Sequence, residues 1–202
     1  DRGDTIDRVE ECLRAGYTSV MLDFSTRPYA ENVAAMREVV ALARPYDVPV
    51  EGELGHIGQA DAVTPEGDGE STLTDPAEAG RFVRETGVDA LAVSIGNAHG
   101  RYPKLPALDL ERLEEIRSAT SVPLVLHGGS GTPEEELQRM ISLGIAKVNV
   151  ATELVTALRG SLLEQWQNGR NLWIPTAQAE AMTAMVPVVE KWIRCTGAAG
   201  RA

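Results

Sequence analysis

Short apolar segments alternate with amphipathic segments along most of this 202-residue chain. Strands are expected where the segments are short, apolar and bounded by turn residues, over residues 19–23, 48–53, 90–95, 123–127 and 146–151. Helices are expected around and between them, over residues 5–15, 27–43, 76–86, 108–119 and 132–143. Apolar strands that alternate with helices are typical of a parallel sheet buried on both faces.

Polar side chains recur where the predicted strands end. Asp23, Glu53, His99, His127 and Asn149 each lie at, or just past, the carboxyl end of a strand. A closed barrel gathers these ends into one mouth, whereas an open sheet uses mainly its switch point. We therefore predict an α/β chain with the (β/α)8 TIM-barrel fold. Five βα units do not close such a barrel, and the chain begins on a helix. We predict a single partial barrel over residues 1–202 that supplies about strands four to eight, with about three upstream units missing.

Residues 153–202 are predicted to form a C-terminal helical extension, with helices near 153–168 and 177–196. Their apolar faces, which carry Trp166 and Trp192, exceed what the last helix of a barrel needs. We expect part of this extension to form a subunit interface in a homo-oligomer, with packing across the base of the barrel as the alternative.

The charge balance narrows the range of partners. The chain has 19 Lys and Arg against 30 Asp and Glu, a formal net charge of −11, and its basic residues form no cluster. A nucleic-acid or anionic-membrane partner is therefore not expected, whereas a small anionic substrate stays open. No apolar run approaches the roughly 20 residues of a membrane span, and the N-terminal segment has no signal-peptide character. The two cysteines are isolated and do not form a disulfide framework. We therefore expect a cytoplasmic protein.

Two turns in the second half of the chain indicate an anion site. Residues 127–131, which contain three glycines, lead into a helix, and residues 149–152 end the last strand and open another helix. Glycines let a ligand approach the backbone, and helix N-termini favour anions. In a complete barrel, the turns after strands seven and eight usually bind phosphate. Each turn alone is most often only a turn, but together they predict a phosphate site.

The three histidines are the candidate metal ligands. His99 and His127 follow different strands and precede glycines, so both imidazoles can turn into the mouth and bind a divalent metal. Two hydrogen-bonded structural histidines are the alternative. Asp23 and Glu53 need a metal, a basic group or solvent as a partner. His56 lies in a long loop over residues 54–74 and is expected to be exposed.

Three motifs occur in order and with undisturbed spacing: GNAHG at 96–100, LHGGSG at 126–131 and KVNVATE at 147–153. The segments AGYTSVMLD at 15–23 and VEGELG at 50–55 accompany them. Together they resemble the class II, metal-dependent ketose-bisphosphate aldolases, in particular the branch of the tagatose- and fructose-bisphosphate aldolases. The resemblance covers essentially the whole chain.

This resemblance implies a lyase that reversibly cleaves a ketose 1,6-bisphosphate, fructose or tagatose, to dihydroxyacetone phosphate and glyceraldehyde 3-phosphate. It implies Zn²⁺ or another divalent metal on His99 and His127, with Asp23 and Glu53 at a second or alternate metal position; a monovalent cation is also compatible with it. Asp1 matches the proton donor, and Asp61 stands near the loop acid that removes the substrate proton. The implied phosphate contacts are Gly100, Gly128, Gly129, Ser130, Asn149, Val150, Ala151 and Thr152.

Arg2 departs from the family pattern. It stands where the resemblance places a third zinc-binding histidine, and a guanidinium has no lone pair for a metal and opposes its charge. His56 is a less favoured substitute ligand, and Asp61 is shorter than the usual loop glutamate. Two other interpretations stay open: a non-catalytic or metal-deficient relative that still binds a sugar phosphate, and a truncated product without stable activity.

Overall fold

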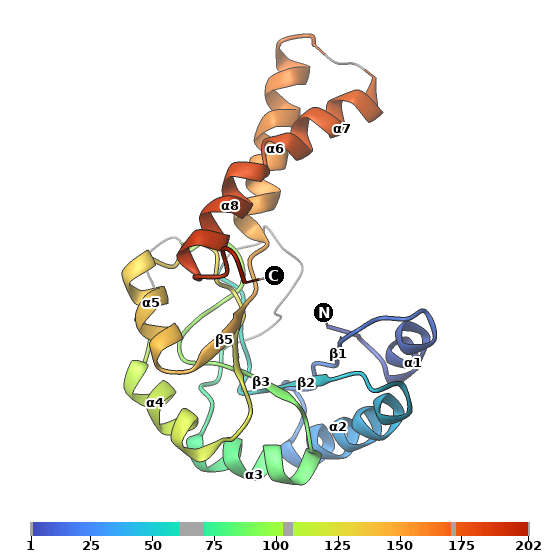
Figure 1. Ribbon diagram of the computed structural model, residues 1–202, viewed down its shortest axis with the longest axis vertical. Coiled ribbons are helices and arrows are strands. Elements are labelled where there is room, and N and C mark those ends of the chain that lie inside the picture. The colour runs from blue at the N-terminus through green and yellow to red at the C-terminus, as the bar shows by residue number, and fades with distance from the viewer. Residues whose placement is uncertain (1, 61–70, 103–106, 171–172, 202) are drawn as a thin grey trace.

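The computed structural model describes residues 2–60, 71–102, 107–170 and 173–201. A curved, five-stranded parallel sheet lies at its centre, and each strand pairs with the next one in sequence (Figure 1). The strands are β1 (Val20–Met21), β2 (Val50–Leu54), β3 (Ala90–Val93), β4 (Leu124–Leu126) and β5 (Ile145–Val148). Sequential order, parallel pairing and curvature together make an arc of a (β/α)8 barrel, as the sequence predicted.

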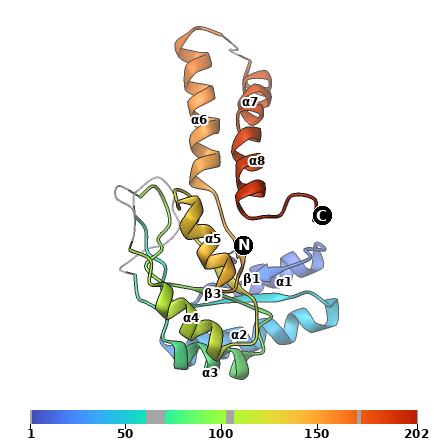
Figure 2. The same cartoon turned by 60° about the vertical axis from the view of Figure 1, so that its left-hand side comes forward.

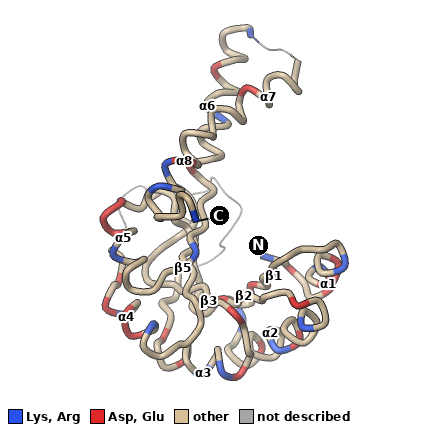
Figure 3. The backbone as a smooth tube through the Cα atoms, viewed as in Figure 1, with Lys and Arg blue, Asp and Glu red and all other residues tan. Residues whose placement is uncertain are grey.

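Helices cover the convex face of this arc (Figure 1). They are α1 (Ile6–Arg14), α2 (Tyr29–Ala43), the short 3₁₀ turn η1 (Arg44–Tyr46), α3 (Pro76–Thr86), α4 (Leu110–Ala119) and α5 (Glu134–Ser142). The hydroxyl of Thr5 and the carboxylates of Asp75 and Asp109 cap the first turns of α1, α3 and α4. Acidic and basic residues are interspersed over the outer faces of these helices (Figure 3).

The main core lies between the helices and the sheet and is mostly aliphatic, with Phe82 among its largest buried side chains. On the inner side, Met21, Ala92 and Val125 form a second, small cluster. Alternate residues of a barrel strand point inward, so this cluster is an apolar part of the barrel interior. The interior is not wholly apolar, because Lys147 of β5 is in register with Val125.

The segment before α1 differs from the prediction, because it pairs with the sheet. The chain does not simply begin on a helix, because Gly3 forms a parallel bridge with Leu22 before α1 starts. The amide of Gly3 also donates to the carbonyl of Met21 at 2.8 Å. This pairing places residue 2 at the edge of the sheet, beside the mouth of the barrel.

The C-terminal extension is a helical arm. α6 (Thr152–Gln167) leads away from the barrel, α7 (Ile174–Thr183) lies beside α6 and leads back, and α8 (Val186–Cys195) completes the return to the barrel (Figures 1 and 2). The prediction of a single helix over 177–196 is wrong, because the structure has two helices there, α7 and α8. Pro187 divides them, since it lacks an amide hydrogen and its ring crowds the preceding turn. Trp192 is buried, whereas Trp166 and Trp173 are 46% and 73% exposed. The predicted subunit interface stays a prediction.

Within the described residues, none of the helices combines the length and the apolar character needed to cross a membrane.

Candidate active site

Two buried histidines lie together where the carboxyl ends of the strands meet. His99 follows β3 and His127 follows β4, and their ring centroids are 5.9 Å apart. Asn97 links the two loops, since its Nδ2 donates to the carbonyl of His127 at 2.9 Å and its Oδ1 accepts from the amide of Ile95 at 2.8 Å. Asn97 is itself buried, so these hydrogen bonds hold the two strand ends in a defined relation.

Glu51 holds His127 from inside the barrel. Nε2 of His127 lies 2.8 Å from Oε1 of Glu51 and 3.2 Å from Nδ2 of Asn149, and Nζ of Lys147 lies 2.8 Å from Oε2 of Glu51. Burial raises the pKa of Glu51, but the hydrogen bonds from His127 and Lys147 outweigh it, so the net pKa is below its ordinary value. A carboxylate only accepts hydrogen bonds, so the contact between Nε2 of His127 and Oε1 of Glu51 requires a proton on Nε2.

Arg2 lies among the acids and the other histidine. Its Nη2 donates to Oε2 of Glu53 at 3.0 Å and lies 2.7 Å from Nε2 of His99, and its Nη1 lies 3.5 Å from Oδ2 of Asp23. Ser25 adds to the cluster, because its amide donates to Asp23 at 2.9 Å and its hydroxyl donates to Glu53 at 3.2 Å. Asp23, Glu53 and His99 are thus gathered around one guanidinium.

Burial dominates the electrostatics of this cluster. Burial and the nearby charge of Asp23 raise the pKa of Glu53 to about 7, against the opposing effects of Arg2 and His127. Burial, the Arg2 guanidinium and His127 lower the pKa of His99 to about 3. His99 is therefore neutral near pH 7, and its Nε2 can accept the hydrogen bond that Arg2 donates.

These residues do not fit a divalent metal. One feature favours an ion: Nδ1 of His127 is buried, lies 3.7 Å from Oε2 of Glu53 and has no hydrogen-bond partner among the described residues. However, Arg2 takes the lone pair of His99 and one oxygen of Glu53, the donors that an ion would need. Correspondingly, in the part of the chain that the structure describes, no three His, Cys, Asp or Glu are placed to hold a metal. The geometry of the described residues therefore fits neither the metal predicted on His99 and His127 nor the second metal position predicted on Asp23 and Glu53.

A cavity of about 290 Å³ opens next to the two histidines. Of the eight residues predicted to contact phosphate, all but Gly129 line this cavity; they are Gly100, Gly128, Ser130, Asn149, Val150, Ala151 and Thr152. The amide of Gly129 instead donates to the carbonyl of Asn149 at 2.9 Å, which ties the two turns together. Thr152 begins α6, so the positive end of a helix dipole lies at the cavity wall.

Close backbone packing shapes the cavity. Gly128 has a φ of +66°, and a Cβ atom there would lie 2.0 Å from the carbonyl oxygen of Ala98. The Tyr102 hydroxyl bonds to the amide of Ala98 and to the carbonyl of Gly128, each at 2.9 Å. Glycine at 128 is therefore required for the β4–α5 turn to pass against the loop that carries His99.

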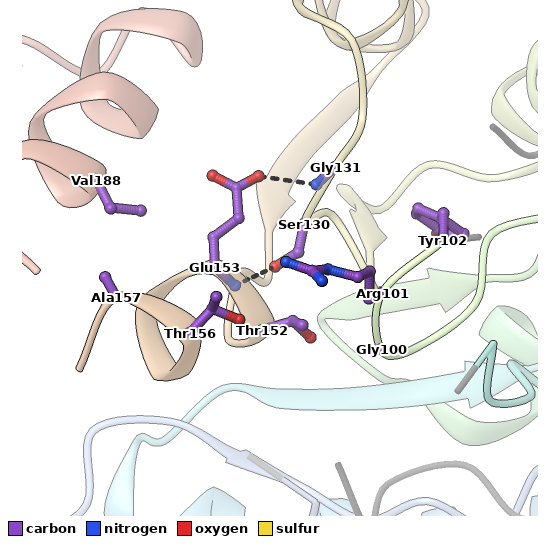
Figure 4. A pocket seen from close by; sticks show the side chains of 10 residues that line it. All are labelled: Gly100, Arg101, Tyr102, Ser130, Gly131, Thr152, Glu153, Thr156, Ala157 and Val188. Carbon is purple, nitrogen blue, oxygen red and sulfur yellow. Dashed lines mark hydrogen bonds between the residues drawn. The ribbon is translucent and has the colours of Figure 1, made fainter. Parts of the chain in front are cut away.

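A larger cavity of about 510 Å³ adjoins the first and extends toward α8 (Figure 4). Glu153 lies at its wall, where Oε1 accepts from the amide of Gly131 at 2.8 Å. Its Oε2 accepts from Nε1 of Trp192 at 3.0 Å and from Nζ of Lys191 at 3.3 Å. Glu153 thus joins the β4–α5 turn to the helix that returns from the arm.

The loop after β2 folds over the mouth. His56 is buried, which overturns the expectation that it is exposed; its Nδ1 lies 3.2 Å from Oγ of Ser25 and its amide donates to Oγ1 of Thr72 at 2.8 Å. Further along, the amide of Ala60 donates to the carbonyl of His99 at 2.7 Å. The loop backbone therefore approaches His99 up to its last described residue before the gap, Ala60.

Asp1 and Asp61, the predicted proton donor and acceptor, lie outside the described residues. Sequence reasoning assigned no role to Ser25, Asn97 or Tyr102. The position of Asn97 shortly past the end of a buried strand was a usable signal, whereas nothing in the local sequence marked Ser25 or Tyr102.

The comparisons with known proteins agree with the motifs. The sequence model of the family described as class II fructose-bisphosphate aldolase matches residues 1–201. The YdjI aldolase from Escherichia coli K12 is 35% identical with a TM-score of 0.85, over 100% of this chain and 69% of that one. A protein from Coccidioides immitis, provisionally assigned as a fructose-1,6-bisphosphate aldolase, is 31% identical with a TM-score of 0.85, over 100% of this chain and 71% of that one.

A third comparison concerns the fold alone. The fructose-bisphosphate aldolase of Campylobacter jejuni is 20% identical, with a TM-score of 0.75 over 98% of this chain and 69% of that one. A family match across the whole described chain, two relatives above 30% identity and the shared barrel arc lead to one assignment. This chain belongs to the class II fructose-bisphosphate aldolase family.

Proposed function

We propose that the protein catalyses reversible aldol cleavage of a ketose 1,6-bisphosphate, fructose or tagatose, to dihydroxyacetone phosphate and glyceraldehyde 3-phosphate. The observation that carries this proposal is the cavity between the β4–α5 turn and the start of α6, which opens directly onto His99 and His127. Membership of an aldolase family supports lyase chemistry at this mouth.

In this proposal, one phosphate lies against Ser130 and the first amides of α6, where the helix dipole stabilises its charge. The carbon chain then extends past Gly100 toward His99 and His127. Asp1 and Asp61 remain the proposed proton donor and acceptor. The described residues that adjoin them in the sequence support this assignment: the side chain of Arg2 bonds to His99, and the amide of Ala60 donates to the carbonyl of His99.

The test is a cleavage assay with fructose and tagatose 1,6-bisphosphate, in which dihydroxyacetone phosphate is detected by coupled reduction with NADH. Ser130→Asp adds a carboxylate to the phosphate cavity and is expected to raise KM at least about tenfold, about 1.4 kcal/mol of binding. Ser118→Asp makes the same change on the exposed face of α4 and should leave KM unchanged. Equal KM values in the two variants would exclude this cavity as the phosphate site.

A second candidate function is that of a sugar-phosphate-binding relative without aldolase activity. The observation that favours it is the Arg2 guanidinium among Asp23, Glu53 and His99. Calorimetric binding of fructose 1,6-bisphosphate with no detectable cleavage of either sugar would select this candidate. Turnover of either sugar would reject it.

A further inference from the structure

The backbone holds Arg2 at the mouth of the barrel. Gly3 pairs with Leu22 at the edge of the sheet, and Arg2 itself has a left-handed φ of 52°, which is uncommon for a residue with a side chain. Its side chain is only 15% exposed. A long cationic side chain at a sheet edge would ordinarily extend into water, so its contacts in the mouth must favour the buried position.

The groups that hydrogen-bond to or pair with the Arg2 guanidinium are the same groups that would bind a metal ion. Nη2 of Arg2 donates to Oε2 of Glu53 at 3.0 Å and lies 2.7 Å from Nε2 of His99, while Nη1 lies 3.5 Å from Oδ2 of Asp23. A guanidinium has hydrogen-bond donors but no acceptor and keeps its charge at all ordinary pH values. The contact with His99 therefore uses the imidazole lone pair, which cannot bind an ion at the same time.

We propose that Arg2 is the resident cation of this site and takes the position that a divalent metal would need. This inference rests on the proposed function, since it identifies the positive group that faces the oxygen atoms of a bound ketose phosphate. Nη1 lies at ion-pair rather than hydrogen-bond distance from Asp23, so it can donate to a carbonyl or hydroxyl oxygen of that ligand. Binding of the sugar phosphate is then independent of divalent metal.

Arg2→His tests the proposal because it replaces the cation with a potential metal ligand. The substitution removes the cation, frees the lone pair of His99 and adds an imidazole beside His127 and Glu53, a set of donors suited to zinc. After incubation with zinc and dialysis, elemental analysis is expected to find about one zinc per chain in Arg2→His. The unsubstituted protein should retain far less than one. Arg8→His adds a histidine on the exposed face of α1 and should match the unsubstituted protein. Retention of about one zinc by the unsubstituted protein, or no gain in a folded Arg2→His variant, would overturn the proposal.

A second measurement needs no variant. Calorimetry with fructose 1,6-bisphosphate should give the same Kd for the unsubstituted protein in EDTA and in added zinc, within about twofold. A Kd that rises about tenfold or more in EDTA would refute Arg2 as the resident cation. That outcome would leave the proposed function intact, because binding still occurs. Absence of binding and of cleavage under both conditions would refute the proposed function and the inference together, whereas metal-dependent binding refutes the inference alone.

Discussion

Gly128→Ala is the substitution that best tests how the backbone builds the site. Two costs add at this position. An alanine must adopt the left-handed φ of +66°, and its Cβ would lie 2.0 Å from the carbonyl oxygen of Ala98, far inside van der Waals contact. Because Ala98 directly precedes His99, relief of this clash must displace the loop that carries that histidine.

Gly131→Ala separates the two costs. Gly131 also has a left-handed φ, +84°, but among the described residues a Cβ there would contact only a Tyr102 ring carbon, at an ordinary distance of 3.4 Å. The conformational cost alone is about 1–2 kcal/mol, so that is the expected loss for Gly131→Ala. Overpacking adds about 1–3 kcal/mol, so Gly128→Ala should lose about 2–5 kcal/mol of unfolding free energy.

Urea unfolding followed by circular dichroism measures both variants, and calorimetry with fructose 1,6-bisphosphate measures the ligand affinity. Gly128→Ala should unfold at a clearly lower urea concentration than Gly131→Ala and should bind the sugar phosphate more weakly. If the two variants share one midpoint, the close approach of Gly128 to Ala98 contributes nothing and the reasoning fails.

Three further predictions concern the supports of the site. Asn97→Ala leaves the buried amide of Ile95 and the carbonyl of His127 without their partner and should cost about 2–4 kcal/mol in urea unfolding; a loss below about 0.5 kcal/mol would contradict the linking role. For Glu153, burial raises the pKa, but hydrogen bonds from Gly131, Trp192 and Lys191 outweigh it, so the net pKa is lowered from 4.5. A lowered folded pKa gives stability that is present above pH 4.5 and lost as pH falls through the folded value. Glu153→Gln should therefore lower Tm at pH 7 and have a smaller effect near pH 3; a Tm difference that is constant with pH would argue against this. Asp75→Ala removes the cap that accepts from the amide of Glu78 and should cost about 1 kcal/mol without changing sugar-phosphate affinity.

The fold was accessible from the sequence because its signals are local and repeated. Each βα unit carries an apolar run, a turn and an amphipathic helix, and the sequential strand order follows from that repetition. The errors occurred where a single residue decides the outcome. Pro187 divides the last predicted helix, and Gly3 pairs with Leu22 although two residues do not make a recognisable strand.

The candidate site likewise has a part that the sequence predicts and a part that it does not. The cavity proposed to bind phosphate is built from glycines and the start of a helix, whose backbone geometry the sequence pattern encodes directly. The cluster around Glu53 depends on contacts between residues far apart in the chain, such as Arg2 with His99, and on Ser25, which no motif marks. His56 illustrates the limit: its place in a polar loop favoured exposure, but the loop folds back and buries it against Ser25.

Electrostatics explains why a single residue can decide which cation occupies the mouth. A divalent ion about 4 Å from the Arg2 guanidinium would be repelled by about 8 kcal/mol at an effective dielectric constant of about 20. Asp23 and Glu53 lie next to Arg2 and are already its counter-ions, so they cannot compensate a second, larger charge without releasing the first. The guanidinium and a metal are therefore alternatives at this site, and residue 2 sets the choice between them while the cavity proposed to bind phosphate stays the same.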